Sequence, residues 1–430
     1  MVDDKSTGKV KAVILVAGPQ KGTRFRPLSL EVPKPLFPVA GKPLLEHHIS
    51  SCCKLPDLEE IIILGFYQSN DTILRFIDDM KRQYKTSIRY LQEYQPLGTA
   101  GGLYHFRDQI VTANTKAIVV IHADIFCVLP LTKMMEMFSS KNENNAGSHI
   151  VLGTQVHQTS SNHSEHGNIV LDNNTFEVNH YVEKPESFVS AIINCGTYVF
   201  HPSVVESLGE VYRNTRDDGE QTSNRELLFF GKHLFTKMAG RGKLFCHLLK
   251  ESFWGSMKSA GSAIYANRRY LDSYKTNDGQ QLVQNEPGKP EIVGDVFIHP
   301  TATVHPTAKL GPNVSIGSNC VIGPGARVKE SIILDGADLR ENCCVLYSII
   351  GWRCLVGAWS RIEGTPHEPN PNFAHALVTN ESLFHADGHL IPSVTVLGCN
   401  VIIPREVIVL NCIVLPHKEL SGSYKNQIIL

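Results

Sequence analysis

A six-residue repeat in the last third of the chain constrains the fold more than any other feature. An apolar residue recurs about every six positions and is often followed by glycine, as in Leu310-Gly311, Ile316-Gly317 and Ile322-Gly323. The repeat positions are Val304, Leu310, Ile316, Ile322, Val328 and Leu334, then Val345, Ile350, Val356 and Ile362. This hexapeptide repeat is typical of a parallel β-helix with a triangular section, in which stacked coils bury one apolar residue per side. We therefore predict a β-helix domain over residues 288–430, with the repeat resuming over residues 397–420.

The repeat is interrupted by an insertion over residues 364–395, which contains Pro, Asn and His but has no six-residue register. A long insertion in a solenoid leaves the stack at one corner and projects from it. Two interpretations stay open, because long loops in compact domains are usually either disordered or functional. The insertion is either a disordered loop or an arm that reaches a partner or a neighbouring site.

The chain before residue 288 alternates apolar runs with amphipathic stretches. The predicted strands are 11–18, 60–67, 87–93, 117–124 and 148–156, and the predicted helices include 43–55 and 72–84. These runs are apolar at nearly every position, which favours strands buried on both faces of a mostly parallel sheet. Alternation of strands and helices predicts βαβ units, and hence a Rossmann-like α/β domain over residues 10–275.

Composition excludes several classes of function. The chain has 41 Lys and Arg against 42 Asp and Glu, so no net field favours nucleic acid or a membrane surface. No apolar stretch is long enough to span a bilayer, and the polar start "MVDDKSTGK" lacks the apolar core of a secretory signal. We therefore expect a cytoplasmic protein.

The cysteines and histidines do not have the spacing of a metal site. The doublets Cys52-Cys53 and Cys343-Cys344 lack the CxxC pattern, so the eleven cysteines are predicted to be reduced and mostly buried thiols. The pairs His47-His48 and His163/His166 have no third ligand at a useful spacing. We expect these histidines to be surface or helix-capping residues.

Two loops at predicted strand ends indicate a nucleotide site. "VAGPQKGTR" (16–24) follows the first strand and "HAD" (122–124) follows the fourth. Ligands of such sheets bind beyond the carboxyl ends of the strands. Glycines let backbone N–H groups approach phosphate oxygens, whereas Pro19 has no N–H to donate.

Taken together, the motifs resemble those of the sugar-1-phosphate nucleotidyltransferases with a left-handed β-helix. Within that group the chain is most similar to the mannose-1-phosphate guanylyltransferase family, which makes GDP-mannose, and especially to its regulatory alpha subunits. The resemblance covers residues 10–430 and is carried by "GTRFRPLS", "EVPKPLFPVAGKPLLEH", "PLGTAGGL", "YVEKP", "INCGTYVF", "GPNVSIG" and "VLPHKEL". It implies an N-terminal nucleotidyltransferase domain and a C-terminal left-handed parallel β-helix.

The resemblance also implies the residues that bind the nucleotide. Gly18, Arg24 and Lys34 match the phosphate-binding loop and cations, although that loop is two residues longer here than in active members. Glu93 matches the carboxylate that would accept hydrogen bonds from N1 and N2 of guanine. A surface carboxylate at the strand end is the alternative interpretation of Glu93. Gly98 and Thr99 match the turn under the base and ribose.

On the sugar side the resemblance is intact. Glu183 and Lys184 in "YVEKP" match the residues that meet the sugar hydroxyls and the sugar phosphate. Asn194 and Gly196 in "INCGTYVF" match further mannose contacts. The resemblance therefore predicts a complete mannose subsite.

The metal site departs from the family pattern. Members of the family hold Mg²⁺ with two aspartates, and Asp124 matches the first of them. In "FWGSMKSAG" (253–261) the second aspartate is replaced by Ser256, and the following glycine by Lys258. A hydroxyl is a poor substitute for a carboxylate and a nearby ammonium repels the metal, so Mg²⁺ should bind less well. Lys258 is predicted either to neutralise a bound diphosphate or to point to solvent.

These residues support three hypotheses about function. The first is a regulatory subunit that binds GDP-mannose without a cofactor and mediates feedback inhibition of a catalytic beta-type subunit. The second is an active mannose-1-phosphate guanylyltransferase, in which Mg²⁺ would be needed and Arg24, Lys34 and Lys184 would be catalytic. The third is a non-catalytic scaffold like the nucleotidyltransferase-shaped subunits of the translation-initiation exchange factor, which would carry a further helical domain. The β-helix is the expected surface for both homo- and hetero-oligomers, with no nucleic acid or membrane partner.

Overall fold

The structure is a computed structural model that describes residues 8–18, 23–68, 71–156, 166–217, 227–250, 252–277, 281–365, 391 and 393–430. The described residues divide into two compact units. The first unit contains residues 8–18 and 45–255, and the second contains residues 23–44 and 256–430, each with the gaps just given. Residues 23–44 therefore fold with the C-terminal part of the chain, although they follow the first strand in sequence.

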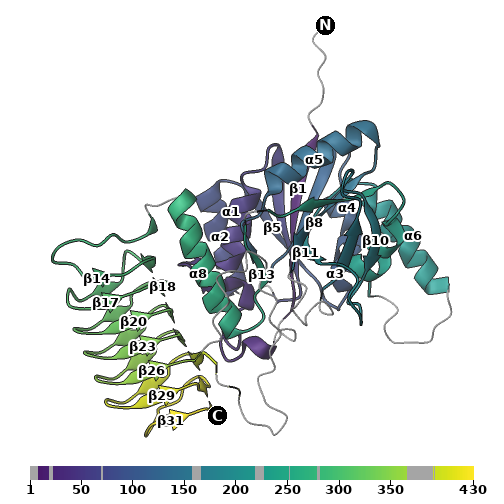
Figure 1. Ribbon diagram of the computed structural model, residues 1–430. Coiled ribbons are helices and arrows are strands. Elements are labelled where there is room, and N and C mark those ends of the chain that lie inside the picture. Colours follow the sequence, from purple (N-terminus) through teal and green to yellow (C-terminus); the bar gives the residue numbers. More distant parts are fainter. Residues whose placement is uncertain are drawn as a thin grey trace. The chain divides into compact units, whose positions relative to one another are not determined.

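The first unit is built on a nine-stranded sheet whose main path runs β10-β9-β11-β6-β1-β4-β5 (Figure 1). Its parallel part consists of β1 (Lys9–Val16), β4 (Leu58–Gly65), β5 (Ser87–Gln92) and β6 (Thr115–His122). The remaining strands are β8 (His149–Gln155), β9 (Asn168–Leu171), β10 (Val178–Val182), β11 (Ile192–Phe200) and β12 (Leu244–Leu248). β11 is antiparallel to both β6 and β8, and β12 is parallel to β8. The five predicted strands are confirmed, and the sheet is mixed beyond β6.

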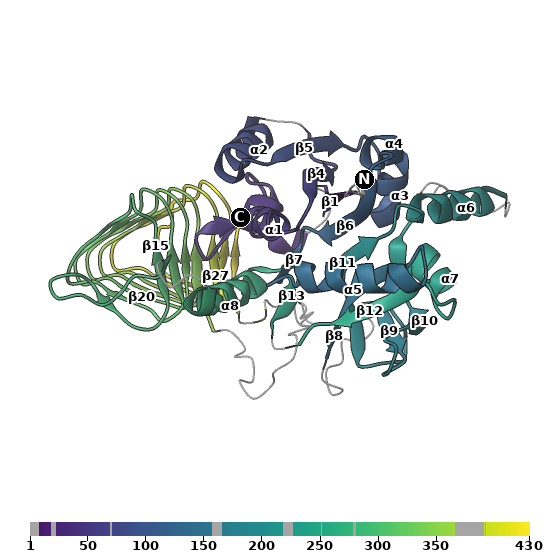
Figure 2. The same cartoon turned by 90° about the horizontal axis from the view of Figure 1, so that it is seen from above.

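Helices follow the strands of this sheet, as the alternating pattern predicts (Figure 2). They are α1 (Leu44–Cys52), α2 (Asp71–Tyr84), α3 (Gly98–His105), α4 (Arg107–Ile110), α5 (Leu131–Asn144), α6 (Val204–Asp217), η4 (Phe230–Phe235) and α7 (Thr236–Met238). The central residues Val13, Ile62 and Val120 are fully buried, because the strands are covered on both faces. The short strands β7 (Ile125–Cys127) and β13 (Trp254–Ser256) pair with each other.

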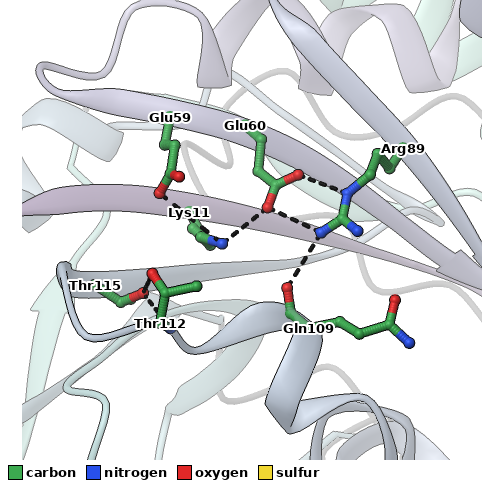
Figure 3. A network of polar contacts seen from close by, with 7 residues as sticks. All are labelled: Lys11, Glu59, Glu60, Arg89, Gln109, Thr112 and Thr115. Carbon is green, nitrogen blue, oxygen red and sulfur yellow. Dashed lines mark hydrogen bonds and ion pairs between the residues drawn. The ribbon is translucent and has the colours of Figure 1, made fainter.

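A charged cluster lies where the parallel strands begin (Figure 3). Lys11 of β1 and Glu60 of β4 are only 2% and 8% exposed, and Lys11 Nζ donates to Glu60 Oε1 at 2.9 Å. Arg89 of β5 donates to both oxygens of Glu60, at 2.7 and 3.0 Å. The buried charges are thus paired and hydrogen-bonded, as buried charges must be in a stable protein. This cluster joins three adjacent strands at the edge opposite their carboxyl ends.

The second unit contains the predicted parallel β-helix, formed by three parallel sheets. The first sheet is β14 (Glu291–Ile292), β17 (Lys309–Leu310), β20 (Arg327–Lys329), β23 (Cys344–Leu346), β26 (Arg361–Glu363), β29 (Ile408–Leu410) and β31 (Tyr424–Lys425). The second is β15 (Val296–Ile298), β18 (Val314–Ile316), β21 (Ile332–Ile333), β24 (Ser348–Ile350), β27 (Thr395–Leu397), β30 (Ile413–Val414) and β32 (Ile428–Ile429). The third is β16 (Thr303–Val304), β19 (Val321–Ile322), β22 (Asp338–Leu339), β25 (Leu355–Val356) and β28 (Ile402–Ile403).

The inward repeat residues form the core of this left-handed β-helix. Leu310, Ile316, Ile322 and Val328 are at most 1% exposed and belong to one continuous apolar cluster. Between the strands the chain turns through residues with positive φ, many of them asparagines such as Asn319 at 54°. Asparagine tolerates this conformation better than most residues, which explains its use at the corners.

The insertion leaves the β-helix between its first and second sheets, after β26 and before β27. The amide of Thr365 donates to the carbonyl of Ser393 at 3.0 Å, so the two ends of the insertion meet. Residues 366–390 and 392 lie outside the described residues. Both interpretations of the insertion, a disordered loop and a projecting arm, therefore stay predictions.

The remainder of the second unit consists of residues 23–44 and the helix α8 (Ala260–Asn277). Residues 23–44 form η1 (Thr23–Phe25), η2 (Lys34–Leu36) and a small antiparallel pair, β2 (Pro38–Val39) and β3 (Lys42–Pro43). The amide of Ala40 donates to Asn267 Oδ1 of α8 at 2.8 Å. The hydroxyl of Tyr274, also on α8, donates to the carbonyl of Ala40 at 3.2 Å.

The structure also tests the expectations about cysteines, histidines and membrane spans. All eleven cysteines are free thiols and nine of them are buried, which confirms the prediction. His48 is not a surface residue, because the inner face of α1 buries it completely. This burial lowers the pKa of His48 to about 4, so the imidazole is neutral. His163 lies outside the described residues. In the described ranges no helix is long and apolar enough to cross a membrane.

Candidate functional site

The predicted site residues are divided between the two units. The first unit holds Gly18, Glu93, Gly98, Thr99, Asp124, Glu183, Lys184, Asn194 and Gly196. The second unit holds Arg24, Lys34, Ser256 and Lys258. Residues 19–22 of the first loop, including Pro19, lie outside the described residues.

Three residues of the first unit follow neighbouring parallel strands. Gly18 lies two residues after β1, Glu93 directly follows β5, and Asp124 lies two residues after β6. The strand order β6-β1-β4-β5 is parallel throughout, so these residues share the carboxyl edge of the sheet. Ligands of open α/β sheets bind at this edge.

Gly18 has no room for a side chain. A Cβ built at this position would lie 2.8 Å from Cβ of Phe66 in the loop after β4, which is closer than real Cβ contacts. The backbone after β1 therefore runs directly against the neighbouring loop. This close approach explains the glycine better than a need for unusual backbone angles.

Glu93 is more than a surface carboxylate. Its amide donates to the carbonyl of Gly65 at 2.7 Å, which continues the pairing of β5 with β4. The side-chain atom Oε1 is buried and lies against the position that a Cβ of Gly102 would occupy. The carboxylate of Glu93 thus packs on the glycine face of α3, and the absence of a side chain at Gly102 makes this possible.

The turn that begins α3 is held from a distant part of the chain. Gly98 has a φ of 80°, which favours glycine, and a Cβ there would collide with the carbonyl of Leu228. That carbonyl accepts hydrogen bonds from the amides of Ala100 and Gly101, and Thr99 Oγ1 accepts one from the amide of Phe230. Sequence analysis does not indicate Leu228 and Phe230, because this contact depends on tertiary packing.

Three of the four residues predicted for the sugar, Glu183, Asn194 and Gly196, belong to one hydrogen-bond network. The amide nitrogen of the Asn194 side chain donates to the hydroxyls of Tyr181 and Tyr198, both at 3.1 Å. The Tyr181 hydroxyl donates to Glu183 Oε2 at 2.8 Å, and the amide of Gly196 donates to Asn194 Oδ1 at 2.9 Å. The structure thus brings Glu183, Asn194 and Gly196 together and adds the two tyrosines, which sequence analysis missed.

Burial fixes the protonation of this network. Desolvation, with a smaller effect from the charge of Glu183, raises the pKa of Tyr181 well above its usual value. Burial raises the pKa of Tyr198 in the same direction. Both phenols stay protonated at neutral pH. The neutral Tyr181 hydroxyl can therefore donate its hydrogen bond to the Glu183 carboxylate and hold that carboxylate in one orientation.

Lys184 has a backbone conformation that is unusual for its residue type. Its φ is 47° and its side chain is exposed. In sequence it stands between Glu183 and the buried Pro185. A lysine in the left-handed region carries a local conformational cost, which persists where the surrounding structure dictates it. The kink directs the chain away from β10 immediately after the Glu183 carboxylate.

Asp124 lies in the bend between β6 and β7, where the amide of Ala123 donates to the carbonyl of Leu15 at 2.9 Å. His122 beside it packs edge-on against Tyr198, with ring centroids 5.7 Å apart. Burial lowers the pKa of His122, although the charge of Asp124 opposes this effect. Asp124 is also close enough to Tyr198 for its charge to contribute to the raised pKa of that phenol.

Asp124 and Ser256 stand at the two metal-ligand positions of the family pattern. The part of the chain that the structure describes contains no group of three or more His, Cys, Asp or Glu side chains suited to a metal ion. The residue that aligns with the second family aspartate is Ser256, whose hydroxyl is a weak ligand for Mg²⁺. No reaction step is therefore assigned to Mg²⁺.

Trp254 connects β13, the strand that ends at Ser256, to the hydrogen-bond network of Glu183 and Asn194. The indole Nε1 of this buried side chain donates to the carbonyl of Cys195 at 3.0 Å, between Asn194 and Gly196. The ring of His166 packs edge-on against Trp254, with centroids 5.3 Å apart. Trp254 therefore fixes the backbone of β11 where the network residues lie.

The predicted residues of the second unit occupy turns and helix ends. Arg24 lies in η1 and is exposed, and Lys34 begins η2 with its Nζ 5.9 Å from the ring centroid of Phe25. The half-buried Lys258 lies before α8, and its amide donates to Ser262 Oγ at 3.0 Å. This hydrogen bond involves only the backbone of Lys258. Both predictions for its ammonium, that it neutralises a bound diphosphate or points to solvent, therefore stay open.

Comparison with known proteins covers both units. A family model described as "Nucleotidyl transferase" matches residues 11–254, and another described as "GMPPB C-terminal domain" matches residues 292–429. The chain is 53% identical over 427 residues to the mannose-1-phosphate guanylyltransferase regulatory subunit alpha-B of Danio rerio, with 98% of this chain and 100% of that protein covered. It is 51% identical to the regulatory subunit alpha of Xenopus tropicalis and 49% identical to that of Homo sapiens, with the same coverage.

Proposed function

Since the chain belongs to the mannose-1-phosphate guanylyltransferase family, in the branch of its regulatory alpha subunits, we propose that it binds GDP-mannose and restrains a catalytic beta-type subunit. In this role the chain is a sensor of the family's product. Mannose 1-phosphate and GTP are the substrates of the catalytic partner, and GDP-mannose is the ligand of this chain.

The network around Glu183 is the observation that carries the proposal. Glu183 Oε2 already accepts a hydrogen bond from Tyr181, which itself is held by Asn194. A carboxylate has about four acceptor positions, so capacity remains for the hydroxyl donors of a sugar. A network that is oriented before the ligand arrives loses little conformational freedom on binding. This pre-organisation supports binding of a hexose next to β10 and β11.

Glu93 supports recognition of the base. Guanine presents an N–H and an NH₂ on one edge, and a fixed carboxylate accepts from both. Oε1 of Glu93 is buried against α3, which fixes the plane of the carboxylate and leaves Oε2 as the acceptor for both donors. Adenine lacks this pair of donors, so a site that reads the base through Glu93 favours guanine.

The altered residues at positions 256 and 258 support binding without turnover. Nucleotidyl transfer depends on neutralising the phosphate oxygens, which Mg²⁺ and its two carboxylates do in active members. Ser256 removes one carboxylate from that set. The loss of such a clamp costs several kcal/mol of transition-state stabilisation, so we expect turnover slower by a factor of about 100 or more.

The first experiment uses the purified full-length chain alone. Pyrophosphate release is measured with GTP, mannose 1-phosphate and Mg²⁺, and GDP-mannose is titrated in parallel by calorimetry. The proposal expects no turnover and clear binding of GDP-mannose. Turnover at ordinary enzyme rates would support the alternative function, an active guanylyltransferase, which the retained Asp124 and Lys184 favour. Neither turnover nor binding would leave a scaffold.

Two variants test whether binding occurs through the proposed network. Glu183→Gln removes the charge that accepts from Tyr181, and GDP-mannose affinity should fall about tenfold, as expected for loss of a charged hydrogen-bonding group. Glu186→Gln is the matched control, because Glu186 is exposed and lies three residues away. Equal effects of the two variants would show that Glu183 is not the ligand contact.

A further inference from the structure

Residues 23–44 contain Arg24 and Lys34, which the family resemblance implies as phosphate-binding cations, and they fold with the β-helix and α8. Nothing in the sequence pattern indicates this grouping. The segment follows the first strand of the Rossmann-like domain in sequence. Sequence order alone would therefore group the segment with that domain. The contacts within the second unit show what holds the segment in place.

A row of aromatic rings runs from Lys34 to the β-helix. Lys34 Nζ lies 5.9 Å from the centroid of Phe25, which meets Phe37 edge-on at 5.0 Å and an interplanar angle of 86°. Phe37 in turn meets Trp352 edge-on at 6.1 Å and 87°. Phe25 and Phe37 are 1% exposed and Trp352 is 9% exposed, so the row is shielded from water. Edge-to-face pairs of this kind are directional as well as apolar.

Trp352 belongs to a corner of the β-helix that makes a second contact with the same segment. The amide of Asn400 donates to the carbonyl of Trp352 at 2.8 Å, and the amide of His417 donates to the carbonyl of Cys399 at 2.8 Å, so successive corners stack. His417 Nε2 lies 2.7 Å from Glu31 Oε1, and Arg353 lies 3.9 Å from the same carboxylate. The corner therefore holds the segment at Phe37 and at Glu31, on either side of Lys34.

We propose that Trp352 is a positioning residue for Lys34 and Arg24, and that through Phe37 and Phe25 the β-helix orients these two cations for binding to phosphate groups of a nucleotide sugar. This inference rests on the proposed function. Lys34 lies over one face of the row and Arg24 is next to Phe25 in sequence, so a shift of Phe25 moves both. Removal of the Trp352 ring leaves space beside Phe37 into which the segment relaxes. A displacement of about 1 Å is enough to weaken a positioned charge contact strongly.

The test compares two tryptophans of the same β-helix in the full-length chain. Trp352→Ala removes the end of the row, and Trp359→Ala is the matched control because Trp359 is 61% exposed at another corner. GDP-mannose affinity is measured by calorimetry for both variants, with thermal unfolding of each to confirm folding. We expect about tenfold weaker binding for Trp352→Ala and a change of less than about twofold for Trp359→Ala.

A double-mutant cycle with Lys34→Ala separates positioning from general destabilisation. If Trp352 acts through Lys34, then Trp352→Ala has little further effect on affinity in the Lys34→Ala background. Trp352→Phe keeps an aromatic edge against Phe37 and should restore most of the affinity. Additive effects of Trp352→Ala and Lys34→Ala, or wild-type affinity in Trp352→Ala, would overturn the inference.

The remaining outcomes are also decisive. If Trp352→Ala does not fold, Phe37→Leu interrupts the row at its middle and replaces it in the same cycle. If the wild-type chain binds GDP-mannose but Lys34→Ala and Arg24→Ala do not weaken binding, the inference fails while the proposed function stands. If the wild-type chain does not bind GDP-mannose, both fail.

Discussion

At the scale of single residues, the carboxylate of Glu60 shows how a buried charge links strands. Burial alone would raise its pKa, but hydrogen bonds from Arg89 and Lys11 outweigh this and lower the pKa of Glu60 below its ordinary value. A lowered pKa in the folded state means that ionised Glu60 stabilises the fold at neutral pH. That contribution is lost as the pH falls through the folded-state pKa, below the ordinary range of glutamate.

We predict that Glu60→Gln lowers the free energy of unfolding by about 2 kcal/mol at pH 7, because Lys11 then loses its buried partner charge. The difference between wild type and variant should begin to shrink as the pH falls below the ordinary glutamate pKa of about 4.3, where the unfolded chain takes up the proton, and should vanish once the folded carboxyl is protonated as well. Urea unfolding over this pH range measures this. Glu59→Gln is the control, because Glu59 is 42% exposed and 3.9 Å from Lys11. A difference that does not depend on pH would contradict the assignment.

Tyr181 is the residue on which the sugar network depends, since it both accepts from Asn194 and donates to Glu183. We predict that Tyr181→Phe weakens GDP-mannose binding about tenfold and leaves GDP binding nearly unchanged, because the lost contact orients the sugar end alone. Calorimetry with both ligands measures this selectivity. Tyr94→Phe serves as the control because Tyr94 is 84% exposed. An equal loss for GDP and GDP-mannose would place Tyr181 outside the sugar subsite.

The sequence indicates some of these residues and cannot indicate others. Glu183 and Asn194 belong to the motifs "YVEKP" and "INCGTYVF", which resemble those of the family. Each residue can therefore be predicted individually from the sequence. Tyr181 and Trp254 look like ordinary aromatic residues of a strand until the fold places their polar atoms on Glu183 and Cys195. The prediction that His48 is a surface residue is wrong for a related reason. Periodicity does not say which side of a short helix is covered by the rest of the fold.

At the scale of elements, the corners of the β-helix depend on residues in the left-handed conformation. Asn319 has a φ of 54° and an exposed side chain, so its conformation is the main constraint on its identity. We predict that Asn319→Val destabilises the β-helix by about 1–2 kcal/mol, whereas Asn319→Gly changes stability by about 0.5 kcal/mol or less. Thermal unfolding of both variants measures the difference. Equal stabilities would show that the corner does not constrain the backbone.

Strands and repeats are the elements that the sequence predicts best, because continuous burial of a strand, or burial at every sixth position, leaves a clear pattern of apolar residues. All five predicted strands are confirmed, and so are eight of the ten predicted repeat residues. The prediction is one residue out of register at Leu334, because Ile333 pairs with Ile316 and Ile350 in the stacked strands. Val304 is only partly buried.

The grouping of residues 23–44 with the β-helix leaves no such pattern. It arises from single contacts between distant positions, such as Phe37 with Trp352 and Ala40 with Asn267.

At the scale of the whole molecule, feedback requires that binding of GDP-mannose to this chain be coupled to the activity of its proposed partner. Coupling is a free energy that both binding events share, so each ligand must change the affinity for the other by the same factor. If GDP-mannose on this chain strengthens the inhibitory association, then the catalytic subunit must raise the affinity of this chain for GDP-mannose equally. This reciprocity can be measured in both directions.

We therefore predict that, in a mixture of this chain with a catalytic subunit, Glu183→Gln shifts the midpoint of GDP-mannose inhibition about tenfold upward and leaves the uninhibited rate unchanged. The shift follows because the sensor binds its ligand more weakly while the catalytic site is untouched. Pyrophosphate release at increasing GDP-mannose measures the midpoint, and Glu186→Gln is again the control. An unchanged midpoint for Glu183→Gln would mean that inhibition arises at the catalytic subunit itself. In that case this chain would contribute assembly and not sensing, even if it binds GDP-mannose in isolation.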